Sequence, residues 1–292
     1  MPIWHAVILG VVQGLTEFLP ISSTAHLLLV RQLFGHPNPD DAFTVVIQLG
    51  TLVAVFAYFR ADLLRLVAGV LIDLRLRKIG TTPDGHTAWL IALGTIPAVV
   101  VGFLFKKQLK ATFFNLQSVA AVATAFALLL AAAEWWSRRR AARGDAPRRD
   151  EELTWLDALW IGCWQACALM PGGSRSGTTL TGGLFAGLGR EAAARFSFLL
   201  SVPVILGAGL KDLYDEYKKL RAPEPGDSPS LFASADETVA LVAGTLVSAV
   251  VGYVAVAWLL HYLKRHSTTV FIVYRLLFGT ALFGAIAAGW LK

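Results

Sequence analysis

The chain has 292 residues, of which 55% are hydrophobic and 16% charged, and its mean hydropathy is +0.59. Soluble domains usually carry about 25% charged residues, so this composition excludes an ordinary soluble domain and predicts an integral membrane protein. The net charge of +6 does not indicate nucleic-acid binding. Most Lys and Arg instead lie between apolar stretches, for example at Arg138–Arg140, as in membrane proteins.

In chain order, an apolar stretch at 2–34 is interrupted by Pro20, and a later one at 154–189 is interrupted by Pro171. A transmembrane helix needs about 20 predominantly apolar residues. Six uninterrupted stretches meet this length and predict transmembrane helices: 42–59, 87–105, 114–136, 191–210, 237–262 and 270–291. Loops are expected at 60–86, 137–153 and 221–236.

The two interrupted stretches predict re-entrant hairpins. Pro20 is followed by Ile-Ser-Ser-Thr, and Pro171 by Gly-Gly-Ser-Arg-Ser-Gly. Neither half of either stretch is comfortably long enough to cross a bilayer alone. Irregular backbone at membrane depth is tolerated only where protein or a water-filled cavity surrounds it. We therefore expect an all-α, polytopic membrane protein with about six transmembrane helices and two helix–loop–helix hairpins.

An internal repeat relates the two hairpins. The segment Gly10-Val-Val-Gln-Gly is echoed 152 residues later by Gly162-Cys-Trp-Gln-Ala, and Phe43-Thr-Val-Val-Ile is echoed by Phe196-Ser-Phe-Leu-Leu. Three predicted spans separate the hairpins, and this odd number makes them enter from opposite faces. We predict a single integral membrane domain, 1–292, with an inverted-topology repeat of about 1–112 and 154–262. Such repeats place broken helices near the midplane.

The distribution of positive charge predicts the orientation. The loops at 60–86, 137–153 and 263–269 carry 13 Lys and Arg together, against 9 in the segments on the opposite side. Cytoplasmic loops carry the excess of positive charge. The first set is therefore expected in the cytoplasm, with both termini and the first hairpin on the outer side.

Polar side chains at membrane depth are costly, so their default interpretation is functional. The hairpins hold two groups of them, which share one cavity if the turns meet. The first group is Gln13, Glu17, Ser22, Ser23 and His26, and the second is Ser174, Arg175, Ser176, Thr178 and Thr179.

Spacing within these groups indicates phosphate chemistry. Ser23 and His26 are three residues apart, so a hydroxyl and an imidazole can lie one helical turn apart, which suits nucleophilic or acid–base catalysis. Arg175 follows a Gly-Gly turn at the expected start of a helix, where backbone N–H groups and a guanidinium can bind phosphate together. Ser22 has an alternative role as a helix cap, and Arg275 is expected to be an interfacial anchor or, alternatively, a phosphate contact.

Two motifs resemble a known family. Gln13-Gly-Leu-Thr-Glu-Phe-Leu-Pro-Ile-Ser-Ser-Thr-Ala-His26 is similar to the first motif of the bacterial undecaprenyl-diphosphate phosphatases, the bacitracin-resistance type of membrane phosphatase. Pro171-Gly-Gly-Ser-Arg-Ser-Gly-Thr-Thr179 is similar to their second motif. The resemblance extends over essentially the whole chain in length, span number and order.

This resemblance implies an activity and a location. Such enzymes hydrolyse undecaprenyl diphosphate to the monophosphate and phosphate, which recycles the lipid carrier for cell-wall (peptidoglycan) synthesis. They lie in the bacterial cytoplasmic (inner) membrane among its lipids, with the active site opening to the outer face. Bacitracin competes for the same polyprenyl diphosphate, and a divalent cation, Mg²⁺ or Ca²⁺, supports activity.

The resemblance also implies residue roles. Glu17 is the essential carboxylate and the metal ligand, and Gln13 is its partner, which is Glu in many relatives. Ser23 and His26 form the nucleophile and base pair, although direct attack by His26 or its activation of water stays open. Arg175 binds phosphate together with a set of hydroxyl residues: Ser22, Ser174, Ser176 and Thr179. Gln13 removes one negative charge, which puts a two-carboxylate metal site in doubt.

Transporters, flippases and other phosphatases are the alternative function classes. An inverted-repeat transporter or a polyprenyl-lipid flippase would use similar broken helices. A lipid phosphatase of the phosphatidic acid phosphatase type would need a Lys-x6-Arg-Pro run and a Ser-Gly-His, and neither occurs. There is also no Walker-type phosphate loop. The sequence leaves a homodimer open.

Overall fold

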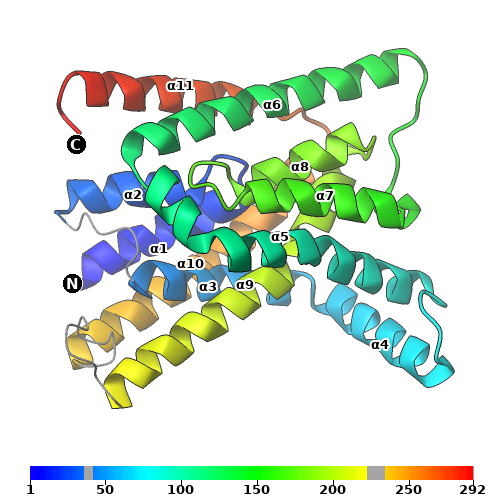
Figure 1. The fold of residues 1–292 in the computed structure, drawn as a ribbon, viewed down its shortest axis with the longest axis horizontal. Coiled ribbons are helices and arrows are strands. Elements are labelled where there is room, and N and C mark those ends of the chain that lie inside the picture. The colour runs from blue at the N-terminus through cyan, green and yellow to red at the C-terminus, as the bar shows by residue number, and fades with distance from the viewer. Residues whose placement is uncertain (36–41, 222–233, 292) are drawn as a thin grey trace.

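The computed structural model describes residues 1–35, 42–221 and 234–291, and these ranges are helical without a β-strand. The helices are α1 (Ile3–Phe18), α2 (Ser23–Leu33), α3 (Ala42–Tyr58), α4 (Arg60–Leu76), α5 (Pro83–Phe113), α6 (Leu116–Ala142), the 3-10 turn η1 (Asp150–Glu152), α7 (Trp155–Cys167), α8 (Arg175–Phe185), α9 (Arg190–Arg221), α10 (Ala235–Leu263) and α11 (Thr269–Ala287). Figure 1 shows them as one bundle. The prediction of an all-α protein is confirmed for the described residues.

Five of the described helices are long and apolar enough to cross a membrane: α5, α6, α9, α10 and α11. The sequence predicted six. The remaining predicted span, 42–59, forms α3, which has only 17 residues. At a rise of about 1.5 Å per residue, it falls short of the roughly 30 Å hydrocarbon core. Five such helices nevertheless indicate a multi-pass membrane protein.

The outward face of α10 supports this conclusion. Val242, Leu246, Val250 and Val254 follow one another at intervals of four residues and are more than half exposed. Residues four apart lie on one side of a helix. An exposed apolar stripe of this length requires lipid around it.

The sequence predicted a loop at 60–86. This prediction is wrong for most of the segment, because α4 occupies 60–76. Its buried residues are Leu66, Gly69 and Asp73, spaced by three and four positions. This spacing produces a narrow packed stripe on an otherwise exposed helix. The predicted loop at 137–153 begins only after α6 ends at Ala142, and most of the predicted loop at 221–236 lies outside the described residues.

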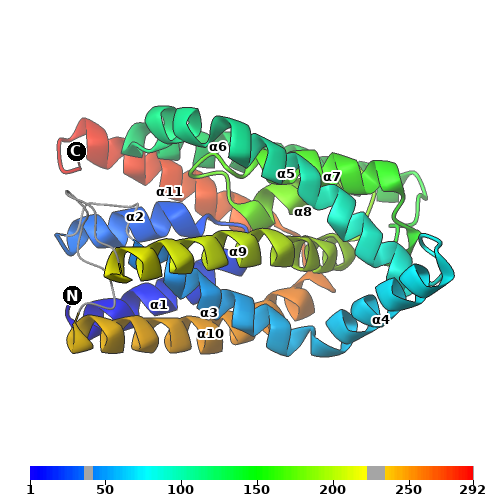
Figure 2. The same cartoon turned by 60° about the horizontal axis from the view of Figure 1, so that its bottom comes forward.

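The helix pairs α1–α2 and α7–α8 approach the middle of the bundle from opposite ends (Figures 1 and 2). Both chain ends lie at the end of the molecule where α1 starts, and α4 lies at the other end (Figure 2). The turns of the two pairs therefore meet inside the bundle.

The two pairs also pack in a similar way. A Cβ atom added to Gly10 of α1 would lie 2.4 Å from the carbonyl oxygen of Gly244, and one added to Gly162 of α7 would lie 2.3 Å from that of Gly94. Each pair thus begins with a helix whose glycine permits close contact with a long helix. This correspondence supports the predicted repeat, whose bounds stay a prediction.

Candidate active site

Each hairpin turn ends at a serine with an unusual backbone conformation. Ser22 has a φ of 76° and Ser174 a φ of 67°, which is uncommon for any residue with a side chain. The Ser22 hydroxyl accepts from the backbone N–H of Ala25 at 3.4 Å, and the Ser174 hydroxyl from that of Gly177 at 3.2 Å. Both serines therefore cap the helix that follows, which confirms the capping role considered for Ser22. Two strained turns with the same geometry indicate functional sites.

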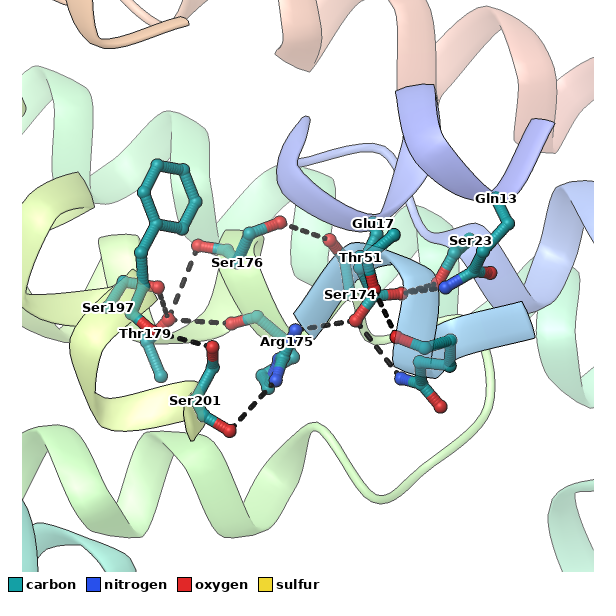
Figure 3. A network of polar contacts seen from close by, with 12 residues as sticks. Gln13, Glu17, Ser23, Thr51, Ser174, Arg175, Ser176, Thr179, Ser197 and Ser201 are labelled. Atoms are coloured by element: carbon teal, nitrogen blue, oxygen red, sulfur yellow. Dashed lines mark hydrogen bonds and ion pairs between the residues drawn. The ribbon is translucent and has the colours of Figure 1, made fainter. Parts of the chain in front are cut away.

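The carboxylate of Glu17 lies between the two turns and accepts four hydrogen bonds. Its Oε2 accepts from Gln13 Nε2 at 2.9 Å and from Ser23 Oγ at 2.8 Å. Its Oε1 accepts from Gln48 Nε2 at 3.1 Å and from Arg175 Nη2 at 2.5 Å. Figure 3 shows Gln13 and Ser23 on one side of Glu17 and Arg175 on the other. The Glu17 side chain is only 4% exposed, so this carboxylate depends on these donors for its charge to be tolerated.

Arg175 joins the second hairpin to the first. Its guanidinium forms the ion pair with Glu17 and donates to the backbone carbonyl of Ser201 on α9 at 3.4 Å. It follows directly after the Ser174 cap, so it stands in the first turn of α8, where free backbone N–H groups point outward. The sequence predicted that a carboxylate, an imidazole, a hydroxyl and a guanidinium meet. The carboxylate of Glu17, the hydroxyl of Ser23 and the guanidinium of Arg175 do so, whereas the imidazole does not join them.

A cavity of about 160 Å³ opens beside this group. Five of the predicted site residues line it: Glu17, Ser22, Ser23, Ser174 and Arg175. Gln48, Thr24 and Gln165 also line it, and the sequence predictions did not place them in the binding site. A space of this size fits a polar headgroup, whereas a long lipid tail would have to lie outside it.

The His26 ring does not hydrogen-bond the Ser23 hydroxyl in this structure. Its Nδ1–H donates to the backbone carbonyl of Ser22 at 2.7 Å, which leaves Nε2 as the acceptor for the Tyr274 hydroxyl at 2.6 Å. This tautomer is assigned from the hydrogen bonds, since a carbonyl oxygen can only accept. The ring also stacks on Phe278, with the ring centroids 4.4 Å apart. The expected hydroxyl–imidazole pair is therefore replaced by a hydroxyl–carboxylate pair, Ser23 with Glu17.

The remaining predicted hydroxyl residues, Ser176 and Thr179, bond to the protein itself. Ser176 Oγ donates to the carbonyl of Leu19 in the first hairpin at 3.0 Å. Thr179 Oγ1 donates to the carbonyl of Arg175 at 2.7 Å and contacts the hydroxyl of Ser197 (Figure 3). Neither residue is among those lining the cavity, so in this structure they support Arg175 instead of facing a ligand.

Arg275 is not an interfacial anchor, as its position near the start of the last span had suggested. It is 1% exposed and donates to backbone carbonyls of both turns: Pro20 at 3.4 Å, and Gly172 and Gly173 at 3.1 Å each. Nor is it among the residues lining the cavity. A single guanidinium from α11 thus holds the two turns side by side.

The residues around the cavity do not fit a divalent cation held by the protein alone. Glu17 is the one carboxylate among the residues that line it, and both of its oxygens already accept two hydrogen bonds. Within the described residues, no three His, Cys, Asp or Glu side chains group as metal ligands. Mg²⁺ is usually bound through one or two free carboxylates together with substrate phosphates and water.

A larger cleft of about 890 Å³ lies at the other end of α8, lined by Arg138, Arg140, Arg148, Arg190 and Arg195 among others. Three of these cations form ion pairs within the protein: Arg148 with Asp157, Arg190 with Glu134, and Arg195 with Asp62 and Asp150. None of the predicted site residues lines it. The smaller cavity is therefore the better candidate site despite its size.

Residues 6–281 match the family model described as bacitracin resistance protein BacA. The chain belongs to this family. Three similar proteins are each named undecaprenyl-diphosphatase. The one from Chlorobium chlorochromatii is 47% identical over 289 residues, covering 99% of both chains. The one from Chloroherpeton thalassium is 46% identical over 292 residues, covering 100% of this chain and 99% of its own. The one from Prosthecochloris aestuarii is 45% identical over 289 residues, covering 99% of both chains.

The match to the family model spans both hairpins, so the residues that line the cavity all fall inside the matched region. The resemblance stated from the two motifs is thereby confirmed at the level of the family.

Proposed function

We propose that this protein hydrolyses undecaprenyl diphosphate to undecaprenyl monophosphate and phosphate in a bacterial membrane. The chain matches proteins named undecaprenyl-diphosphatase along its whole length. The structural observation that carries the proposal is the contact of Glu17 with Arg175, which brings both hairpins to one polar cavity. This activity recycles the lipid carrier for cell-wall synthesis.

The site supports a mechanism in which Ser23 attacks the terminal phosphorus. Arg175 turns from Glu17 to the diphosphate oxygens, aided by the free N–H groups at the start of α8. Glu17 has then lost its counter-ion and takes the Ser23 proton, across the 2.8 Å hydrogen bond that already exists. The Ser23 Oγ–P bond forms as the bridging P–O bond breaks, and undecaprenyl monophosphate leaves. Water then cleaves the phosphoserine and releases phosphate. Positioning and charge stabilisation supply most of the rate in phosphoryl transfer.

His26 has a supporting role in this mechanism. Its two ring nitrogens bind Ser22 and Tyr274, which fixes the start of α2 and hence Ser23. The version in which His26 acts as the base requires the ring to leave both partners.

We propose further that the hairpins are re-entrant and that the cavity opens to the outer face. The hairpin helices are short, with 16, 11, 13 and 11 residues, and their turns meet in the middle of the bundle (Figure 1). Of the Lys and Arg clusters, those at 60–86 and 137–153 belong to the end opposite the chain termini. By the positive-inside rule this end is cytoplasmic, which places the start of α1 outside.

Bacitracin is expected to compete with the enzyme, because both would bind the same diphosphate. A requirement for Mg²⁺ or Ca²⁺ is a separate prediction, tested by titrating a chelator into the assay. A homodimer also stays a prediction.

Purified protein in detergent provides the deciding test. Phosphate release from undecaprenyl diphosphate is expected from the wild type, and Arg175→Ala is expected to lose at least about 100-fold in kcat/KM, since the charge on the phosphates is left unstabilised. A transporter or flippase does not cleave the diphosphate and has no second compartment in detergent, so it would release no phosphate. Absence of phosphate release from folded wild-type protein, over a range of Mg²⁺ and Ca²⁺ concentrations, would exclude the proposed activity.

A further inference from the structure

Gln165 is a buried side chain whose amide has no hydrogen-bond partner among the described residues. It lies on α7, is 2% exposed, and lines the same cavity as Glu17 and Arg175. Both its Nε2 and its Oε1 lack a partner in this part of the chain. A buried amide that makes no hydrogen bond costs free energy, and such groups are rare enough in native proteins that each requires an explanation.

The repeat explains how this amide became free. Gln165 is the counterpart of Gln13, 152 residues earlier in the sequence. Gln13 donates to Glu17, one helical turn later, at 2.9 Å. The residue one turn after Gln165 is Leu169, whose side chain has no hydrogen-bond acceptor. The second hairpin thus keeps the donor of the first but lacks its carboxylate.

The charges around the cavity indicate which kind of ligand would hydrogen-bond to the Gln165 amide. The same cavity is lined by Glu17, whose oxygens already have four donors, and by Arg175, whose guanidinium contacts Glu17. An anion bound by Arg175 would bring several oxygen acceptors into the cavity that Gln165 lines. A phosphoryl group offers three such oxygens, more than Arg175 alone can satisfy.

We propose that Gln165 is a substrate-contacting residue, whose Nε2 donates to a non-bridging oxygen of the diphosphate. Its Oε1 accepts from water bound in the same cavity. This inference rests on the proposed function and adds a residue from α7 to the binding site. A site built to hydrogen-bond its ligand leaves the amide unpaired when the ligand is absent, and so discriminates strongly against ligands without an acceptor.

Gln165→Leu tests the proposal because a ligand contact and a structural role change stability in opposite directions. Leu has similar size and removes the unpaired amide. The KM for undecaprenyl diphosphate is expected to rise roughly 10-fold to 100-fold, as for the loss of one hydrogen bond to a charged group, with kcat changed less than about three-fold. The inhibition constant of inorganic pyrophosphate is expected to rise in parallel. The melting temperature in detergent is expected to stay the same or rise.

Two further variants separate the outcomes. Gln165→Glu places a carboxylate beside the diphosphate, so it is expected to raise KM more than Gln165→Leu. Ser248→Ala is the matched control, because Ser248 is also buried with an unpartnered hydroxyl but does not line the cavity, and it should leave KM unchanged. The inference is overturned if the KM of Gln165→Leu lies within two-fold of the wild-type KM. It is also overturned if Gln165→Glu has the same KM as the wild type. Failure of the wild type to release phosphate would instead overturn the proposed function.

Discussion

Arg175 and Glu17 form an ion pair at 2.5 Å although they lie 158 residues apart in the chain. The pair joins the turn of one hairpin to the last helical residues before the turn of the other. In a buried setting each charge depends on the other, and removing one partner leaves an uncompensated charge. The same contact therefore joins the two hairpins and, in the proposed mechanism, is exchanged for a contact of Arg175 with the substrate phosphate.

The ion pair predicts strongly coupled effects of mutation. Glu17→Gln and Arg175→Lys are each expected to lower kcat/KM by at least about 100-fold, in the range for a lost general base or phosphate clamp. The double variant is expected to lose less than the product of the two, because both act in one unit. A double-mutant cycle on phosphate release measures this. Strictly multiplicative losses would show that the two residues act independently.

Arg275 predicts a loss of both stability and activity. Arg275→Met leaves the carbonyls of Pro20, Gly172 and Gly173 without this donor, and an unsatisfied buried group costs about 1–3 kcal/mol. The unfolding midpoint in detergent should fall, and kcat should fall at least about 10-fold as the turns separate. Lys264→Met is the control, since the Lys264 side chain is 55% exposed. Wild-type stability and turnover in Arg275→Met would mean that the turns are held by other contacts.

The different partners of Ser23 and His26 predict different losses on mutation. Ser23→Ala is expected to lower kcat at least about 1,000-fold, since it removes the nucleophile. His26→Gln is expected to lower kcat much less, because Glu17 accepts the Ser23 proton and His26 positions only the start of α2. Measurement of kcat for both variants checks this. A loss in His26→Gln as large as that in Ser23→Ala would assign the base to His26.

Asp73 predicts a pH-dependent stability at the end of α4. The Thr81 hydroxyl, together with the Thr81 and Gly80 backbone N–H groups and Trp89, lowers the pKa of Asp73 to about 2 despite its burial. Because the folded pKa lies below the ordinary value of 3.8, the ionised carboxylate stabilises the fold above about pH 4, and this contribution is lost as pH falls towards 2.

Asp73→Asn tests this directly. It is expected to be less stable than the wild type at pH 7, and the two melting temperatures should converge between pH 4 and pH 2. Thr81→Val removes the hydroxyl donor to Asp73. In a protein that carries Thr81→Val, Asp73→Asn should therefore lower the melting temperature at pH 7 by less than it does in the wild type. Parallel melting curves of wild type and Asp73→Asn over this pH range would show that Asp73 carries no such contribution.

Much of this arrangement could be predicted from the sequence, because the bilayer limits what polar residues can do. Apolar stretches of sufficient length predicted the five long helices, and prolines followed by serines predicted the hairpin turns. The same 152-residue offset relates Ser22 to Ser174, whose common backbone geometry became clear only from the structure. Glu17 and Arg175 were expected to share one cavity because an inverted repeat brings the turns of its broken helices together.

The parts that could not be predicted depend on tertiary contacts. Three-residue spacing allowed Ser23 and His26 to face each other, but Tyr274, 248 residues further along the chain, takes the imidazole instead. Arg275 looked interfacial because it lies near the start of the last span, and its partners, backbone carbonyls in two distant turns, could not be read from the sequence. Gln165 gave only one signal, its correspondence to Gln13. The helix α4 was missed because its buried stripe is narrow.

The most direct test is a structure of the Ser23→Ala variant with undecaprenyl diphosphate bound. The terminal phosphorus is expected between the Arg175 guanidinium and the position of the missing Ser23 hydroxyl, with the lipid tail leaving the cavity between helices. Diphosphate bound instead in the arginine-lined cleft at the other end of α8, with the Glu17–Arg175 pair intact and its cavity empty, would contradict the account.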